Sequence, residues 1–144
     1  MADPLPEIDR DLIGREFDRT VSKPVSAERM IRYARACGET NPRYLEDGPN
    51  LVATPTFPIT VRRERFVPEG IPMEVMYRGM DAGKDVEIGV VVRPGDVLTG
   101  VGSLHDIYDK TGRSGKLRFV VLRMVVTNQR DEMVAVIDQR MMFR

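Results

Sequence analysis

The chain has 144 residues, of which 42% are hydrophobic and 31% charged, with no tryptophan and nine methionines. This length and composition fit one globular domain, residues 1–144, and argue against disordered and membrane-spanning classes. Twenty-two basic residues balance twenty-two acidic ones, so no overall charge attracts nucleic acid or a membrane surface. Because the only cysteine is Cys37 and no apolar run precedes Gly14, we expect a reduced, cytoplasmic protein.

The start of the chain predicts a short strand and a helix. We expect residues 1–12 to form a flexible segment and residues 17–21 to form the strand. Ser26 is a favourable N-cap, so a helix should begin there and end near Gly38. Cys37 falls on the apolar side of this helix, and we expect it to be a small buried side chain rather than a nucleophile.

A second helix is expected after a turn-rich stretch. Thr54 followed by Pro55 offers an N-cap and a proline at the first helical position. Residues 62–65, Arg-Arg-Glu-Arg, are then expected on the solvated face of this helix. The alternative is that these residues contact a phosphate of a ligand.

The second half of the chain reads as four long antiparallel strands joined by turn-forming sequences, with the ranges 86–92, 97–108, 117–128 and 133–143. In the third of these strands apolar side chains alternate on both faces, so we expect cover on both sides. One helical layer covers a single face of a sheet. The other face is therefore expected to meet a partner chain or a second part of the assembly.

Residues 36–44, 53–58, 93–98, and 113–115 with 127–129 form four local sequences. In this order along the chain, they resemble those of MaoC-like dehydratases of the N-terminal hotdog type. Residues 36–44, Ala-Cys-Gly-Glu-Thr-Asn-Pro-Arg-Tyr, are similar to the hydratase motif Gly-Asp-x-Asn-Pro-x-His. Residues 53–58 resemble the Ala-Pro-Pro-Thr-Phe stretch that opens the central helix, and residues 93–98 resemble an Arg-x-Gly-Asp turn. Residues 113–115 and 127–129 match the later hairpins.

This resemblance implies an α+β hotdog fold, in which a curved antiparallel sheet wraps a long central helix. Hotdogs of the family pair through their sheets and act on acyl thioesters of coenzyme A or acyl carrier protein. They add water to, or remove it from, the carbon pair beside the thioester. No cofactor is implied, and a lone histidine, His105, offers no metal site; we expect it to be an ordinary strand residue.

Both members of the family's catalytic dyad are changed in this chain. When the motif is aligned on Asn41-Pro42, Glu39 occupies the Asp position and Tyr44 the His position. A phenol with a pKa near 10 is a poor base at neutral pH, so no residue is assigned a catalytic role with confidence. By position in the family motifs, Asn41, Thr56 and Phe57 are the substrate-binding candidates.

Three functions follow from these observations. The first is the non-catalytic, substrate-binding subunit of a heteromeric (R)-specific enoyl-thioester hydratase or 3-hydroxyacyl-thioester dehydratase, whose partner hotdog carries the dyad. The second is a self-sufficient hydratase, or a thioesterase, that uses Glu39. The third is a homo-oligomer that binds acyl thioesters without chemistry. The sequence leaves open the acyl chain and the choice between coenzyme A and carrier protein.

Overall fold

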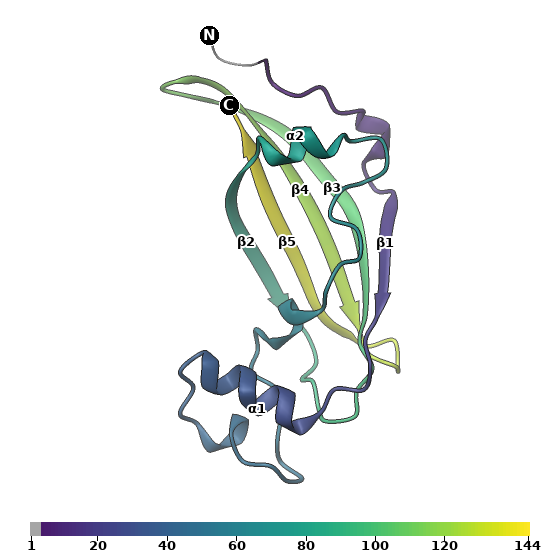
Figure 1. Cartoon of the computed structure of the whole chain (residues 1–144), viewed down its shortest axis with the longest axis vertical. Helices are drawn as coiled ribbons and strands as arrows, with labels where there is room; N and C mark the ends of the chain where they lie inside the picture. The colour runs from purple at the N-terminus through teal and green to yellow at the C-terminus, as the bar shows by residue number, and fades with distance from the viewer. Residues whose placement is uncertain (1–3) are drawn as a thin grey trace.

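The structure, a computed structural model, describes residues 4–144 and consists mainly of one antiparallel sheet of five strands. The strands lie in the order β1-β3-β4-β5-β2, so β1 and β2 form the two edges (Figure 1). Their bounds are β1 Glu16–Val21, β2 Met80–Ile88, β3 Thr99–Gly112, β4 Gly115–Thr127 and β5 Met133–Phe143. The expected α+β class is confirmed.

The predicted strands agree well with the sheet, with one exception. The ranges expected at 17–21, 97–108, 117–128 and 133–143 correspond to β1, β3, β4 and β5 within a few residues. The strand expected at 86–92 is wrong in its bounds, because β2 begins six residues earlier and ends at Ile88. Gly89 follows the last residue of this strand at a close approach to β5, where a Cβ would lie 2.0 Å from the carbonyl oxygen of Met133.

Helix α1, Ala27–Ala36, confirms the first predicted helix and lies beyond one end of the sheet (Figure 1). The Ser26 hydroxyl accepts a hydrogen bond from the Arg29 amide at 3.2 Å, as an N-cap does. Gly38, with φ of 74°, follows the last turn in the left-handed conformation that glycine adopts most readily. The expected burial of Cys37 is wrong, because this residue is exposed at the C-cap.

The long central helix expected after Thr54 is absent from the described chain. A short 3-10 turn, η3, covers Phe57–Thr60, and the next helix is the five-residue α2, Met73–Tyr77. Between them, residues 61–72 cross the sheet without regular structure; we call them the crossing segment. Prolines at three places between Phe57 and α2 disfavour a continuous helix, because each removes an amide donor and restricts the residue before it.

A buried carboxylate fixes the crossing segment to the sheet edge. Asp18 of β1 is 6% exposed and accepts hydrogen bonds from the amides of Glu64 and Arg65, both at 3.2 Å. In a helix, these two amides would bind carbonyl oxygens of the preceding turn. Asp18 satisfies them without a helix, so this contact stabilises the extended path of the crossing segment.

The expectation that residues 62–65 lie on a solvated helix face is therefore wrong in its structure and only partly right in exposure. Arg62, Glu64 and Arg65 are exposed, whereas Arg63 is partly buried. The guanidinium of Arg63 lies 3.4 Å from the Leu122 carbonyl oxygen, to which it donates a hydrogen bond. Burial lowers the pKa of Arg63.

The apolar core consists of two clusters at opposite ends of the sheet. The first, beside α1, includes Met30, Phe57 and Leu98. The second lies under α2 and includes Leu104, Val120, Phe143 and Met76.

Part of the segment expected to be flexible belongs to the second cluster. Leu5, Ile8 and Leu12 pack against it, and η1, Arg10–Leu12, forms one turn. The rest of that segment, residues 1–3, lies outside the described residues. Within residues 4–144, no helix has the length and apolar character needed to cross a membrane.

Candidate functional site

A small cavity of about 50 Å³ lies where two of the sequence motifs, residues 36–44 and 53–58, meet. The residues that line it come from the loop after α1, from the Ala-Thr-Pro-Thr-Phe stretch, from the end of β2 with the loop that follows, and from β5. They are Arg43, Tyr44, Val52, Ala53, Thr54, Pro55, Pro58, Ile88, Val90, Val91, Val92 and Val134. The walls are thus largely apolar, as in sites for hydrocarbon groups.

Backbone hydrogen bonds hold these segments together. The Ala53 amide donates to the Val92 carbonyl oxygen at 2.9 Å, and the Val52 amide donates to the Arg43 carbonyl oxygen at 3.3 Å. The Val90 amide donates to the Met133 carbonyl oxygen at 2.9 Å. The cavity therefore has a floor fixed to the sheet.

Thr54 is the buried polar side chain of the cavity floor. Its side-chain oxygen is closed to solvent and has no hydrogen-bond partner among the described residues. The expected N-cap role of Thr54 is wrong, because η3 begins later and Thr56 holds the N-cap position without a capping hydrogen bond from its side chain. A buried hydroxyl without a partner is unusual and costs stability.

The carboxylate of Glu39 binds its own loop. Glu39 Oε1 accepts hydrogen bonds from the amides of Thr40 at 2.9 Å and Asn41 at 3.0 Å. Glu39 is not among the residues that line the cavity. The Glu39 carboxylate is therefore held through one oxygen by the turn that follows α1, and it does not line the cavity.

Tyr44 and Asn41 occupy different places in this loop. Tyr44 is partly buried on the cavity wall, with the Arg43 guanidinium 5.9 Å from its ring centroid. Asn41 is exposed, and its side-chain oxygen accepts a hydrogen bond from the Arg43 amide at 3.0 Å, which caps the 3-10 turn η2, Pro42–Tyr44. The structure thus brings Tyr44, but not Asn41, to the cavity.

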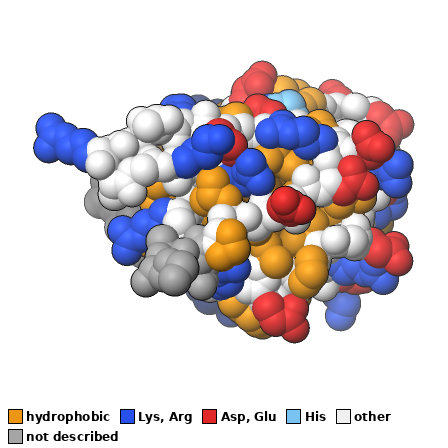
Figure 2. Space-filling model, turned by 90° about the horizontal axis from the view of Figure 1, so that it is seen from above, with side chains coloured by type: hydrophobic (Ala, Val, Ile, Leu, Met, Phe, Trp, Pro, Cys, Tyr) orange, Lys and Arg blue, Asp and Glu red, His pale blue; other side chains and the backbone are white. Residues whose placement is uncertain are grey.

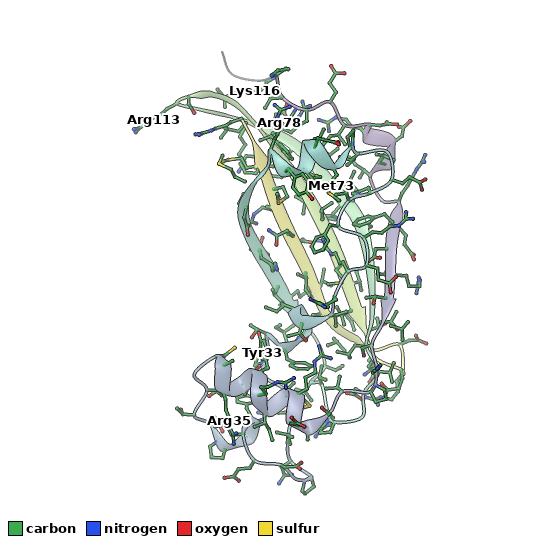
Figure 3. All side chains as sticks on the ribbon, viewed as in Figure 1. Tyr33, Arg35, Met73, Arg78, Arg113 and Lys116 are labelled. Carbon is green, nitrogen blue, oxygen red and sulfur yellow. The ribbon has the colours of Figure 1, made fainter. Side chains whose placement is uncertain are left out.

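Thr56 and Phe57 lie behind the cavity, against α1. Phe57 is 1% exposed, and the ring of Tyr33 packs edge-on against it with centroids 5.6 Å apart. Tyr33, labelled in Figure 3, donates a hydrogen bond from its hydroxyl to Thr56 Oγ1 at 3.1 Å. Burial raises the pKa of Tyr33. These contacts hold α1 against the cavity floor.

The remaining candidates lie elsewhere. His105 is an exposed residue of β3 at an irregularity between Leu104 and Asp106, as expected for a strand residue. No group of three or more His, Cys, Asp or Glu residues within the described chain could hold a metal ion. A wider cleft of about 290 Å³ lies beside β1 and is lined by both arginines and glutamates, among them Arg65 of the basic run 62–65, but none of the four family-like motifs reaches it.

Exposed apolar side chains flank the free edge strand β2 at both ends. At one end Ile88, Val90 and Val91 are 39–44% exposed beside the cavity. At the other end Tyr77 is 81% exposed, Met73 43% and Met80 38%. Figure 2, which shows the α2 end of the molecule, has hydrophobic side chains gathered among charged ones. Such exposure at both ends of a strand whose outer edge is unpaired is typical of a surface that meets another chain.

Comparison with known proteins identifies the family. The model of the FAS1-like dehydratase domain region matches residues 11–137. The chain belongs to this family. In sequence it is similar to UPF0336 protein SCO4636 of Streptomyces coelicolor, with 27% identity over 118 residues that cover 73% of this chain and 77% of that protein.

Several solved structures share the fold. The ChsH1-ChsH2 complex of Mycobacterium tuberculosis matches with a TM-score of 0.66 and 19% identity, covering 90% of this chain and 82% of that one. The HadBC (3R-hydroxyacyl-ACP dehydratase) complex of the same organism matches with a TM-score of 0.66 and 19% identity, covering 94% and 99%. The MaoC-like dehydratase of Rhodospirillum rubrum matches with a TM-score of 0.63 and 22% identity, covering 91% of each chain. The expected hotdog fold and MaoC-like resemblance are confirmed.

Sequence reasoning missed two parts of the site. It treated Thr54 as a cap, whereas Thr54 lies unpaired on the cavity floor. It also places residues 90–92 inside a strand, whereas they follow its end, with Val90 and Val91 exposed at the cavity rim and Val92 buried beneath them. In the sequence, the apolar run at 90–92 is followed directly by a turn motif. This pattern could have indicated that the apolar wall of the cavity continues past the end of the strand.

Proposed function

We propose that this chain is the non-catalytic, substrate-binding subunit of a heteromeric (R)-specific enoyl-thioester hydratase or 3-hydroxyacyl-thioester dehydratase. The proposal rests on which residues occupy the two dyad positions and on what those residues contact. Hydration of an enoyl thioester needs a base to activate water and an acid to deliver a proton. Glu39 instead binds two amides of its own loop, and Tyr44 replaces the histidine.

The partner would supply the missing proton transfer. The ChsH1-ChsH2 and HadBC structures, which share this fold, are complexes of differently named components. The exposed apolar groups at both ends of β2 support pairing of this edge with another hotdog. An acyl thioester of coenzyme A or of a carrier protein would then lie between the two chains, with its hydrocarbon part against Ile88, Val90 and Val91.

The residues assigned from the family motifs act mainly by positioning in this proposal. Asn41 shapes the loop that carries Tyr44, while Thr56 and Phe57 fix α1 behind the cavity. In this proposal the rim residues and Tyr44 contact the acyl group directly. The apolar rim favours a hydrocarbon chain over a polar substituent.

The test is hydration of crotonyl-CoA and of a longer enoyl-CoA by the purified chain, alone and mixed with a hotdog that carries the Asp and His dyad. We expect turnover only in the mixture. In the mixture, Glu39→Gln should leave kcat nearly unchanged, because Glu39 performs no proton transfer. Turnover by the chain alone that Glu39→Gln abolishes would refute the proposal and make Glu39 the base.

A further inference from the structure

The charges of β2 select the kind of chain that can pair with this edge. The pairing of β2 with β5 is regular from Lys84 to Ile88, where consecutive residues are paired one to one. Side chains alternate between the two faces of a strand, so Asp85 and Glu87 share one face while Lys84, Val86 and Ile88 share the other. Asp85 and Glu87 are both exposed.

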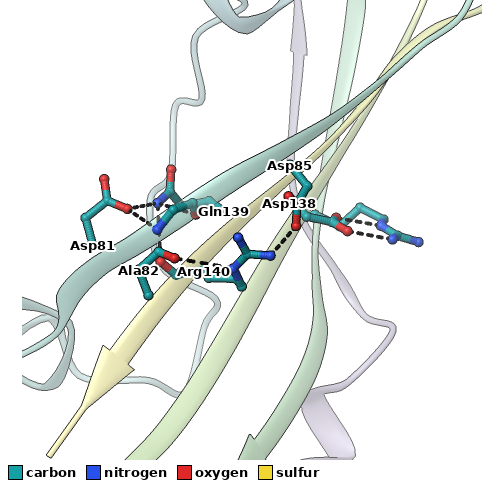
Figure 4. Close-up of polar contacts among 8 residues, drawn as sticks. Asp81, Ala82, Asp85, Asp138, Gln139 and Arg140 are labelled. Atoms are coloured by element: carbon teal, nitrogen blue, oxygen red, sulfur yellow. Dashed lines mark hydrogen bonds and ion pairs between the residues drawn. The ribbon is translucent and has the colours of Figure 1, made fainter.

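The acidic side chains lie on the outer face of the sheet. Asp85 is opposite Asp138 of β5, and Glu87 is opposite Val136. Asp138 is bound by Arg123 at 2.7 Å, and Arg140 of β5 forms an ion pair with Asp85 (Figure 4). Asp85 nevertheless keeps 66% of its side chain exposed at the edge, and Glu87 forms no ion pair among the described residues.

Pairing of β2 with a second copy of itself would bring like charges together. A two-fold axis perpendicular to the sheet makes the two strands antiparallel and keeps each side chain on its own face. Residues directly opposite each other must then belong to the same alternating set, so Lys84 never lies opposite Asp85 or Glu87. A register centred on Lys84 places two lysines opposite each other.

Three of the other symmetric registers of the regular stretch also bring carboxylates together, and the fourth, centred on Ile88, would pair β2 with residues 89–91, which lie beyond the end of the strand. A register centred on Asp85 or on Glu87 places that carboxylate opposite its own copy. A register centred on Val86 places Asp85 opposite Glu87 twice. Like charges directly opposite each other across strands are destabilising, so none of these self-pairings is favoured.

We propose that the β2 edge is built for a different chain, whose edge strand carries Lys or Arg at two alternate positions opposite Asp85 and Glu87. An apolar residue between them, on the other face, would lie against Val86. The role of the partner rests on the proposed heteromer, whereas the charge pattern depends only on the residues of β2. Basic residues at these two positions would distinguish the partner from a second copy of this chain.

The first experiment measures self-association by sedimentation velocity. The double variant Asp85→Asn/Glu87→Gln removes the repulsion, and Glu46→Gln/Asp47→Asn, in an exposed loop, changes the net charge equally and is the matched control. We expect the first variant to self-associate about tenfold more tightly than the wild type, which corresponds to about 1.4 kcal/mol, and the control to match the wild type. The difference should shrink in 1 M salt, where charges are screened within about 3 Å.

The second experiment mixes the wild-type chain with its charge-reversed variant Asp85→Lys/Glu87→Lys. We expect a mixed dimer that is tighter than either chain with itself. A wild type that dimerises as tightly as the neutral variant, or a mixture that gains nothing over the separate chains, would overturn the inference. Both experiments read association and not turnover, so their failure is distinguishable from failure of the proposed activity.

Discussion

Asp18 is the residue whose removal should most affect the crossing segment. Its carboxylate accepts two amide hydrogen bonds, from Glu64 and Arg65, while 6% exposed. Hydrogen bonds to a charged group contribute about 1.5–3 kcal/mol each, and distances of 3.2 Å favour the lower value. Asp18→Ala should therefore lower the free energy of unfolding by about 3 kcal/mol. For a chain of this length that corresponds to a fall in Tm of roughly 6–12 °C.

Release of the crossing segment from β1 can be measured separately from the loss of stability. The crossing segment carries Arg62, Arg63 and Arg65, so its release should make it an early site of trypsin cleavage at temperatures where the sheet remains folded. Urea unfolding and timed trypsin digestion measure the two effects. Glu64→Ala is the matched control, because the Glu64 side chain is exposed and its amide is retained. Wild-type stability together with wild-type resistance to trypsin in Asp18→Ala would refute the assigned anchoring.

Three further changes test other parts of the structure. Gly89→Ala places a Cβ 2.0 Å from a carbonyl oxygen of β5 and should cost about 3 kcal/mol in urea unfolding; wild-type stability would contradict this close approach. Thr54→Val removes a buried hydroxyl without a partner and should stabilise the chain by about 1 kcal/mol, seen as a Tm rise of roughly 2–4 °C; a lower Tm would reveal a partner for that hydroxyl. Arg123 holds the pKa of Asp138 below its usual range, so the stabilisation is present above pH of about 4 and is lost as pH falls through the lowered value. Arg123→Ala should thus cost about 1 kcal/mol at pH 7, after allowance for solvent screening, and less at pH 3; an equal cost at both would contradict the charge pairing.

Local signals predicted the parts of the fold that local chemistry decides. Ser26 and Gly38 set the ends of α1, because capping depends on a few neighbouring residues. Strands β3, β4 and β5 followed from their apolar alternation and the turns between them. The hotdog fold itself came from ordered motifs and was confirmed by structural neighbours.

The absence of a central helix is only partly predictable from local signals, because Pro58, Pro68 and Pro72 disfavour a continuous helix but do not determine the path of the chain. Pro55 favours the first turn, and only a turn of 3-10 helix forms. The path of the chain beyond it is decided by Asp18, which lies more than forty residues away in sequence. A contact between residues so far apart is not visible in the local sequence pattern. The family resemblance therefore predicts the family's long helix at this place.

The candidate site was only partly accessible to sequence reasoning for the same reason. The motifs located the loop with Glu39 and Tyr44, and the structure places Tyr44 on the cavity wall. Whether Glu39 faces a substrate or its own backbone depends on side-chain direction, which spacing does not determine. The exposure of Cys37 likewise depends on α1 lying beyond the end of the sheet, where its C-terminal turn is left uncovered.

The strand order also constrains how the chain folds during synthesis. β1 pairs with β3, and β2 pairs with β5, so neither of the first two strands has its partner when it leaves the ribosome. The consecutive strands β3, β4 and β5 pair with their immediate neighbours and can form a sheet as soon as they emerge. Assembly is therefore expected to begin in the second half of the chain. β1 can pair once β3 has emerged, whereas β2 remains without its partner until β5 is complete and is exposed to aggregation for longer.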